Sequence, residues 1–330
     1  MTLHKITESV WYEKHPLTLI LLPLSLFYQV CIKIRNLLYT TRLLSKYKVS
    51  VPVIVVGNIT VGGNGKTPFV IWLCQFLTQK GYFPGIISRG YGGDCNKSPQ
   101  LVTSDSSPSQ VGDEPLLLAQ RSGRPVIVFH NRYLAAVQLL KQTNCNILVC
   151  DDGLQHLSLE RELEIVVIDG NRRFGNGYCL PAGPLRDSIN RLSSVDIIVA
   201  KNKALKNEHL MNYEYEDLQS IHIDKKSLNI QKLHGKTVHA VAGIANPFEF
   251  HSYLKNKGVK IIKHVFPDHH AYVASDLEFN DNLPIVMTEK DAVKCKTFVA
   301  DNMWYLPIKA RMDNKFHYEI TNLLKKTSNG

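Results

Sequence analysis

Short apolar runs alternate with amphipathic stretches over the first 200 residues. Residues 51–56 (VPVIVV) are continuously apolar, which is typical of a strand buried on both faces of a parallel sheet. From residue 68 to 80 the apolar positions follow helical spacing, and Gly81 ends the pattern. Further strands are expected at 84–88, 125–130, 147–150, 163–169 and 195–200, and helices at 112–121 and 131–142. This order predicts an α/β fold with a doubly wound, mainly parallel sheet.

A smaller α/β pattern follows near the C-terminus. Its expected strands are 237–242, 259–262 and 284–287, its expected helix is 247–257, and TEKD at 288–291 is expected to form a capping box. The polar, charged stretch before this pattern is expected to be a link. The predicted organisation is an N-terminal segment (1–48), a core (49–202), a linker (203–234) and a C-terminal α/β domain (235–330).

The N-terminal segment contains an uncharged, largely apolar stretch at residues 16–32. A helix over this stretch would be roughly 25 Å long, which is short for a spanning helix of about 20 apolar residues. Five basic residues follow between 33 and 48 without an acidic one, and each contributes about 1 kcal/mol beside an anionic leaflet. We expect a hydrophobic helix that lies in or dips into the membrane interface, with a buried core helix and a full span as alternatives.

Composition and charge narrow the class of protein. The chain has 330 residues, 44% of them hydrophobic, which suits two packed domains and excludes overall disorder. Its formal net charge is +10, and the first 50 residues hold seven basic and two acidic side chains, a net +5. Because these charges flank an apolar stretch, we expect an anionic membrane surface as partner and no nucleic acid. Seven cysteines without a Cys-x-x-Cys pair favour a reducing cytosol over a disulfide framework or a zinc site.

A glycine-rich loop follows the first expected strand. Residues 57–67 (GNITVGGNGKT) lead directly into the expected helix, which is the context of a phosphate loop. Such a loop turns its backbone N–H groups towards phosphate oxygens, and the helix N-terminus adds partial positive charge. Lys66 is expected to reach the β- and γ-phosphates and Thr67 to ligate Mg²⁺. The expected nucleotide-binding residues are Thr60, Val61, Gly62, Gly63, Asn64, Gly65, Lys66 and Thr67.

A second nucleotide-binding motif, ILVCDD, lies at residues 147–152. An apolar strand that ends in aspartate is the usual partner of a phosphate loop, because its carboxylate holds Mg²⁺ directly or through water. Asp151 and Asp152 therefore join Thr67 as expected metal-binding residues. Which of the two aspartates ligates the metal stays open at this point.

Two departures from familiar patterns concern the nucleotide. The strict phosphate-loop pattern has glycine where this chain has Thr60, and we expect the extra glycines at 62 and 63 to compensate. After the strand at 195–200 comes Asn202-Lys203, but Leu205 stands where guanine-specific enzymes commonly have aspartate. We therefore favour ATP over GTP.

Seven short motifs carry a family resemblance. They are VVGNITVGGNGKTP (55–68), SRGYGG (88–93), GDEP (112–115), DDGLQH (151–156), LPAGPLR (180–186), FPDH (266–269) and TEKDAVK (288–294). In this order, over about residues 10–310, the chain resembles tetraacyldisaccharide 4′-kinases of the lipid A pathway. The N-terminal hydrophobic helix with basic neighbours and the atypical residue 60 also resemble that family.

The resemblance implies a P-loop NTPase-like, ATP- and Mg²⁺-dependent kinase. It implies phosphorylation of the 4′-hydroxyl of tetraacyldisaccharide 1-phosphate to give lipid IVA, by a peripheral or monotopic protein at the cytoplasmic face of the inner membrane. The core at 49–202 would then be the kinase core. A membrane-associated nucleotide switch without a small-molecule acceptor is the alternative, and neither hypothesis sets the oligomeric state.

The resemblance also implies roles for particular residues. Asp113 is the expected catalytic base, and His269 is expected to pair with it and to tune or relay the proton. Without the resemblance, the sequence favours Asp113 as the N-cap of the helix that follows and His269 as a structural residue. Independently of the resemblance, three arginines beside glycine-rich loops, Arg89, Arg173 and Arg186, are expected to clamp substrate or ATP phosphates, with solvated surface arginines as the alternative.

Overall fold

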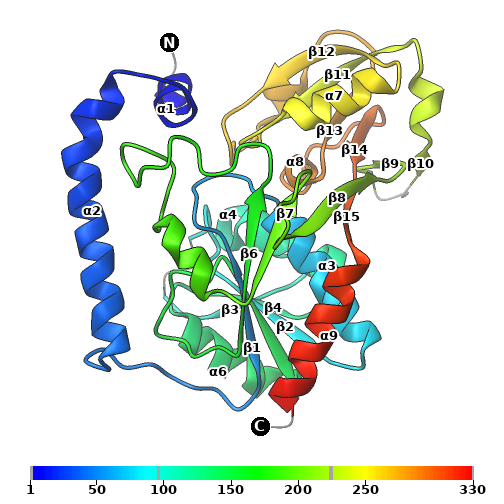
Figure 1. Cartoon of the computed structure of the whole chain (residues 1–330). Helices are drawn as coiled ribbons and strands as arrows, with labels where there is room; N and C mark the ends of the chain where they lie inside the picture. The colour runs from blue at the N-terminus through cyan, green and yellow to red at the C-terminus, as the bar shows by residue number, and fades with distance from the viewer. Residues whose placement is uncertain (1–2, 95–96, 223–225, 329–330) are drawn as a thin grey trace.

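The structure is a computed structural model that describes residues 3–94, 97–222 and 226–328. The described strands form one sheet of nine strands and one of six. In Figure 1 the smaller sheet lies above the larger one, and helix α2 (Leu17–Thr40) stands beside the large sheet as a separate column. The chain therefore has the predicted α/β core, the smaller α/β domain and the N-terminal hydrophobic helix.

The nine-stranded sheet is parallel except at its two edges. Its spatial order is β15 (Ile308–Met312), β8 (His209–Tyr215), β7 (Ile197–Lys201), β6 (Leu163–Asp169), β1 (Val53–Gly57), β5 (Ile147–Asp151), β2 (Pro84–Ser88), β4 (Val126–Val128) and β3 (Gln100–Val102). Only the edge pairs, β15 with β8 and β3 with β4, are antiparallel among the described strands. This is the predicted doubly wound, mainly parallel sheet, and we call it with its helices the core domain.

Apolar residues on both sides of the central strands let helices cover both faces of this sheet. The helices of this part are α3 (Lys66–Gln79), α4 (Pro108–Val111), α5 (Asp113–Ser122), α6 (Arg132–Gln142), the 3₁₀ helix η1 (Ile189–Ser194) and α9 (Asn314–Ser328). Ile54 and Val56 of β1 pack with α3, α5 and α9, while Val53 and Val55 pack with α6 on the other face. Full burial of such a side chain contributes about 1.5–3 kcal/mol, so the alternation fixes the strand between two cores.

The six-stranded sheet with its helices forms the smaller domain. Its order is β10 (Ser227–Leu228), β9 (Leu218–Ser220), β14 (Met303–Leu306), β13 (Ile285–Thr288), β11 (Thr237–Ala242) and β12 (Lys260–Val265). Its helices are α7 (Phe248–Asn256), α8 (Glu289–Ala292) and the 3₁₀ helices η2 (Ile230–Leu233) and η3 (Ala274–Leu277). Val238 and Ala240 pack on α7, whereas Val241 and Met287 face Tyr272 on the opposite side.

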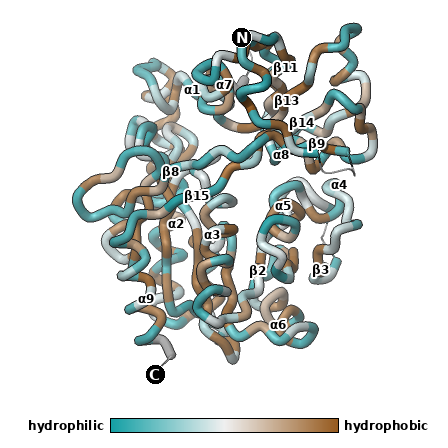
Figure 2. Tube along the Cα trace, turned by 90° about the vertical axis from the view of Figure 1, so that its right-hand side faces the viewer, coloured by the Kyte–Doolittle hydropathy of each residue, from teal (hydrophilic) through white to brown (hydrophobic). Residues whose placement is uncertain are grey.

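The stretch expected to be a link, residues 203–234, instead contains β8, β9 and β10. Its polar composition conceals an alternating strand: His209 and Met211 of β8 are buried, while Asn212 and Glu214 are exposed. After the smaller domain, β15 returns to the large sheet beside β8, and Figure 2 shows these two strands running side by side towards the smaller domain. The predicted boundaries at 203 and 235 thus miss secondary structure that joins the two sheets, and the four-part division of the chain stays a prediction.

Two helices form the N-terminal segment, α1 (Leu3–Tyr12) and α2. Within the described residues, α2 is the one helix long and apolar enough to cross a membrane. Only Thr18 and Ser25 of α2 are buried, whereas Ile20 and Phe27 are 69% and 70% exposed. The Ser25 hydroxyl donates to the Cys179 carbonyl at 2.8 Å, so one side of the helix touches the core domain. The alternative of a buried core helix is therefore wrong.

Candidate active site

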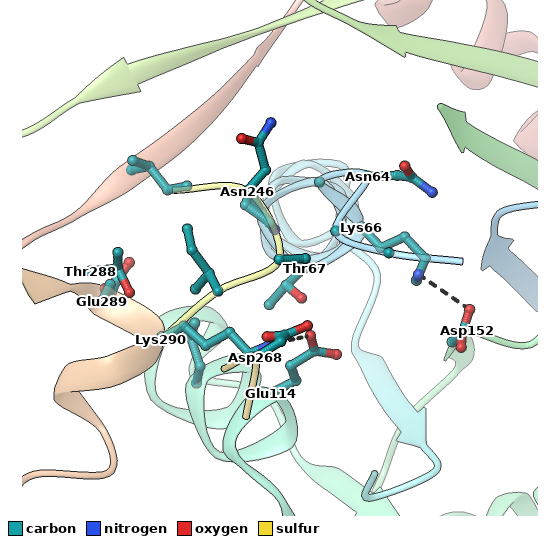
Figure 3. A pocket seen from close by; sticks show the side chains of 18 of the residues that line it. Asn64, Lys66, Thr67, Glu114, Asp152, Asn246, Asp268, Thr288, Glu289 and Lys290 are labelled. Carbon is teal, nitrogen blue, oxygen red and sulfur yellow. Dashed lines mark hydrogen bonds and ion pairs between the residues drawn. The ribbon is translucent and has the colours of Figure 1, made fainter. Parts of the chain in front are cut away.

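A cleft of about 630 Å³ lies between the core domain and the smaller domain. Its floor is the phosphate loop with the carboxyl ends of β2, β5 and β7, which is where ligands bind in doubly wound sheets. The loop after β11 and the start of α8 line it from the smaller domain. Figure 3 shows Lys66, Thr67 and Asp152 on the core side, with Asn246 and Lys290 on the other.

The phosphate loop has the geometry that the sequence predicts. Gly65 lies at the N-cap of α3 with φ of 87°, a left-handed conformation that favours glycine, and α3 begins at Lys66. Residues 61–67 all line the cleft. Thr60 does not line it: this residue is buried, and its hydroxyl accepts a hydrogen bond from Asn64 Nδ2 at 2.7 Å. The side chain of Thr60 thus stabilises the phosphate loop through its hydrogen bond with Asn64.

Asp151 and Asp152 lie where β5 ends, and their surroundings differ. Asp151 is buried; it accepts a hydrogen bond from the Ser88 hydroxyl at 3.1 Å, and its other carboxylate oxygen has no partner. Burial, with Glu114 and Asp152 nearby, raises the pKa of Asp151 to about 7. A buried carboxylate oxygen without a partner is costly and suits a cation.

Asp152 is neutralised by two cations. Arg186 donates to both its carboxylate oxygens at 3.0 Å, and Lys66 Nζ lies 3.3 Å away. Burial alone would raise the pKa of Asp152, but Lys66 and Arg186 outweigh burial and lower it. The described residues contain no group of three or more His, Cys, Asp or Glu that could hold a metal. Mg²⁺, however, is usually held by one or two carboxylates with substrate phosphates, and Asp151, Asp152 and Thr67 supply oxygen ligands of that kind.

Asp113 and His269 meet at the side of the cleft, although they are 156 positions apart in the sequence, and His269 lines the cleft. His269 Nδ1 lies 3.0 Å from both carboxylate oxygens of Asp113. Burial would raise the pKa of Asp113, yet the hydrogen bond to His269 and the charge of Lys290 lower it. Burial likewise lowers the pKa of His269, but Asp113 outweighs it and raises that pKa. The N-cap of α5 is Gly112 rather than Asp113; the Asp113 carboxylate accepts the Glu114 backbone N–H at 2.8 Å and faces the histidine.

A charged cluster beside this pair was not predicted from the sequence. Lys290 Nζ lies 3.0 Å from Glu114 Oε1, 3.2 Å from Asp268 Oδ1 and 3.3 Å from His269 Nε2. The motifs GDEP, FPDH and TEKD contain these residues, but the sequence of TEKD by itself predicts a capping box. That interpretation is right for Thr288, whose hydroxyl accepts from the Asp291 backbone N–H at 3.2 Å, and it leaves Lys290 free to face the cleft.

The three predicted arginines separate into two groups. Arg89 and Arg186 line the cleft. Arg173 does not, because its guanidinium donates to both carboxylate oxygens of Glu208 at 2.8 Å. The expectation that Arg173 faces a substrate phosphate is not supported by its position.

Aromatic side chains from both domains also face the cleft. Tyr213, Tyr215 and Phe250 line it. Asn202, part of the Asn-Lys pair in the sequence, donates to Glu249 Oε1 at 2.8 Å, and buried Lys201 lies 2.9 Å from the same oxygen. These side chains therefore hold α7 of the smaller domain against β7 of the core domain.

Phosphoryl transfer is the chemistry that such a cleft serves, and a P-loop kinase is the class of protein that this fold and site define. The family model for tetraacyldisaccharide-1-P 4′-kinase matches residues 17–325. The chain belongs to this family.

Relatives and a solved structure agree with this membership. The tetraacyldisaccharide 4′-kinase of Methylobacillus flagellatus is 48% identical over 325 residues, covering 97% of each chain. That of Nitrosococcus oceani is 46% identical over 319 residues, covering 96% of this chain and 94% of the relative. The crystal structure of LpxK from Aquifex aeolicus in complex with ATP superimposes with a TM-score of 0.78 at 28% identity, covering 93% of this chain and 99% of that one. The chain is thus a phosphotransferase of lipid A biosynthesis that acts as a 4′-kinase.

Proposed function

We propose that this kinase uses Asp113 as the base that accepts the 4′-hydroxyl proton when the γ-phosphoryl group of ATP moves to tetraacyldisaccharide 1-phosphate, giving lipid IVA. The observation that carries the proposal is the 3.0 Å contact between Asp113 and His269, one from each domain, because His269 lines the cleft that also holds the phosphate loop. Its lowered pKa keeps Asp113 ionised and able to accept a proton.

The phosphate loop is suited to hold the triphosphate. A side chain on Gly62 would meet open space and one on Gly63 only Ala245 of the smaller domain, so the loop backbone is accessible from the cleft. Lys66 and Arg186 supply two positive charges beside it. When phosphate oxygens bind there, we expect both cations to turn from Asp152 to the phosphates.

Thr67, Asp151 and Asp152 are the residues that would hold Mg²⁺. Bound Mg²⁺ would neutralise charge on the transferring phosphoryl group. The unpartnered carboxylate oxygen of Asp151 supports this assignment, because a cation would remove the cost of its burial.

The reaction then needs only positioning and one proton acceptor. The 4′-oxygen forms a bond to the γ-phosphorus, the bond between that phosphorus and the β,γ-bridging oxygen breaks, and ADP leaves with the electron pair. Asp113 takes the hydroxyl proton, and His269 holds Asp113 in place and stabilises its charge. Because these residues belong to different domains, the cleft must be closed for the reaction, which also keeps water from the γ-phosphate.

We propose that α2 and its basic flank bring the enzyme to the anionic cytoplasmic face of the inner membrane, where its lipid substrate lies. Exposed apolar residues along α2 and the basic residues after it support this proposal. Substrate and enzyme would then meet at one surface.

The test is transfer of ³²P from γ-labelled ATP into a lipid-extractable product by the purified chain, with Asp113→Asn as the matched variant. The wild type is expected to label the acceptor disaccharide and the variant to label it at least about 10²-fold more slowly. Nucleotide hydrolysis or exchange without labelled lipid would instead support a nucleotide switch.

A further inference from the structure

Arg121, near the C-terminal end of α5, contacts the smaller domain and the strands that lead to it. One guanidinium nitrogen lies 3.1 Å from Glu289 of α8. The other donates to Glu216, directly after β8, at 2.8 Å and to the carbonyl of Ile308, the first residue of β15, at 3.4 Å. One side chain thus joins α5 to α8 and to both strands that connect the domains.

These contacts are shielded from water. The side chains of Arg121, Glu289 and Glu216 are 20%, 8% and 28% exposed. Burial raises the pKa of Glu289 to about 7, and the charge of Arg121 opposes this rise. A planar guanidinium can hold two carboxylates with separate nitrogens, which a lysine ammonium on a flexible chain does less well.

The opposite end of α5 carries the proposed base. Asp113 and Arg121 are eight residues apart on the same helix, which places their backbones about 12 Å apart. The short helix α8 contacts both ends of α5. Lys290 contacts Glu114 beside the base, and the neighbouring Glu289 contacts Arg121. One contact would let α5 pivot against the smaller domain, whereas two contacts at separate points fix its direction.

We propose that Arg121 is a positioning residue for phosphoryl transfer, which holds α5 against the smaller domain and so keeps Asp113 aligned with His269. The inference rests on the proposed role of Asp113. Arg121 itself does not line the cleft, so its effect on the reaction passes through the helix. A misplacement of about 1 Å at a reacting group can cost about 10²-fold in rate.

The experiment compares Arg121→Gln and Arg121→Lys with a matched control, Arg311→Gln. Arg311 pairs with Glu214 at 2.6 Å across the same strands β15 and β8, but both side chains are exposed. We expect Arg121→Gln to lower kcat about 10- to 100-fold, with the dissociation constant of ATP changed less than about 3-fold. Arg121→Lys should lie between, since it keeps one contact, and Arg311→Gln should resemble the wild type. A loss of ATP affinity as large as the loss of kcat would overturn the inference.

Combining Arg121→Gln with Asp113→Ala in one chain separates this inference from the proposed function. If Arg121 acts through the position of Asp113, then Arg121→Gln has little further effect on the residual kcat of Asp113→Ala. If Arg121→Gln lowers kcat as much in the Asp113→Ala variant as in the wild type, the inference is overturned while the base assignment stands. A nearly normal kcat for Asp113→Ala would instead refute the base itself. If Arg121→Gln does not fold, Arg121→Lys carries the same comparison.

Discussion

Lys66 is held over the cleft by Asp152, 3.3 Å away, and it is not part of a hydrophobic core. We therefore expect Lys66→Ala to fold but to lose stabilisation of charge in the transition state, lowering kcat by about 10³-fold. The check is kcat at saturating ATP, with thermal unfolding to verify the fold. Lys80→Ala changes an exposed lysine just after the same helix and should be neutral. Turnover near that of the wild type in folded Lys66→Ala would contradict our assignment of the loop.

Asp151 is a residue where function and stability conflict. Its pKa of about 7 in the folded protein lies above its ordinary value of 3.8, so the folded state keeps a proton that the unfolded chain has lost. The contribution of Asp151 to stability therefore falls as pH rises from about 4 to 7, and the full cost is present above pH 7.

We expect Asp151→Asn to unfold at a higher temperature than the wild type at pH 8, with a smaller difference at pH 5. The same variant should lose Mg²⁺-dependent kinase activity. Calorimetry at the two pH values, without metal or nucleotide, measures the first effect. A difference in unfolding temperature that is equal at both pH values would show that ionisation of Asp151 is not the cause.

Among the elements, the two N-terminal helices combine the exposed apolar residues of α2 with contacts of α1 to the core domain. Deletion of both helices would disturb more than the membrane contact, because in α1 Trp11 Nε1 donates to the Pro181 carbonyl at 3.0 Å and the Trp11 carbonyl accepts from the Asn176 N–H at 2.8 Å. Point substitutions on the exposed side of α2 are therefore a cleaner test of the membrane assignment.

The double variant Ile20→Glu/Phe27→Glu should no longer float with vesicles that contain anionic phospholipid, because it places two charges in the apolar surface. Activity on lipid should fall while ATP binding persists. Tyr318→Glu, on α9, changes a residue that is 73% exposed and should float normally. Flotation of the double variant at moderate salt would refute the anchor.

How far the sequence predicts an element depends on whether its burial pattern is local. Strands such as β1 and β5 are apolar on both faces, so they and the motifs at their ends could be predicted. Strand β8 could not, since only His209 and Met211 are buried and the exposed polar residues that follow, Asn212 and Glu214, suggest a link. The sequence also does not predict where a long side chain points. Arg173 is a candidate for phosphate binding by its charge, but its guanidinium donates to Glu208, 35 positions away.

Over the whole molecule, the proposed proton path exists only when both domains are in contact. Asp113 and His269 should therefore behave as one unit. We expect Asp113→Ala to lower kcat strongly, His269→Ala to lower it less, and the double variant to be little worse than Asp113→Ala. The measurement is a double-mutant cycle on kcat at saturating ATP. Losses that multiply would mean that the two residues act independently.

The pH dependence of the same variants has a definite sign. His269 lowers the pKa of Asp113 against burial, so activity should rise with pH as Asp113 loses its proton in the acid range. In His269→Ala, Asp113 stays buried but loses the hydrogen bond that lowers its pKa. The rising limb of the pH–activity profile should therefore move to higher pH. A limb that stays in place or moves to lower pH would show that His269 does not tune the base.

The return of β15 to the large sheet has a consequence for how such an enzyme can be built. Tyr215 and Ile308 are partners in register at the point where the chain leaves the large sheet and comes back. Residues 216–307 are therefore a cassette inserted into a hairpin, and insertions are tolerated where the two crossing points lie close together. A short turn in place of the cassette would close β8 onto β15. What remained would keep Lys66, Asp113 and Asp151 but lack His269, so under the proposed mechanism the cassette supplies the partner of the base to a core that already holds the phosphate loop.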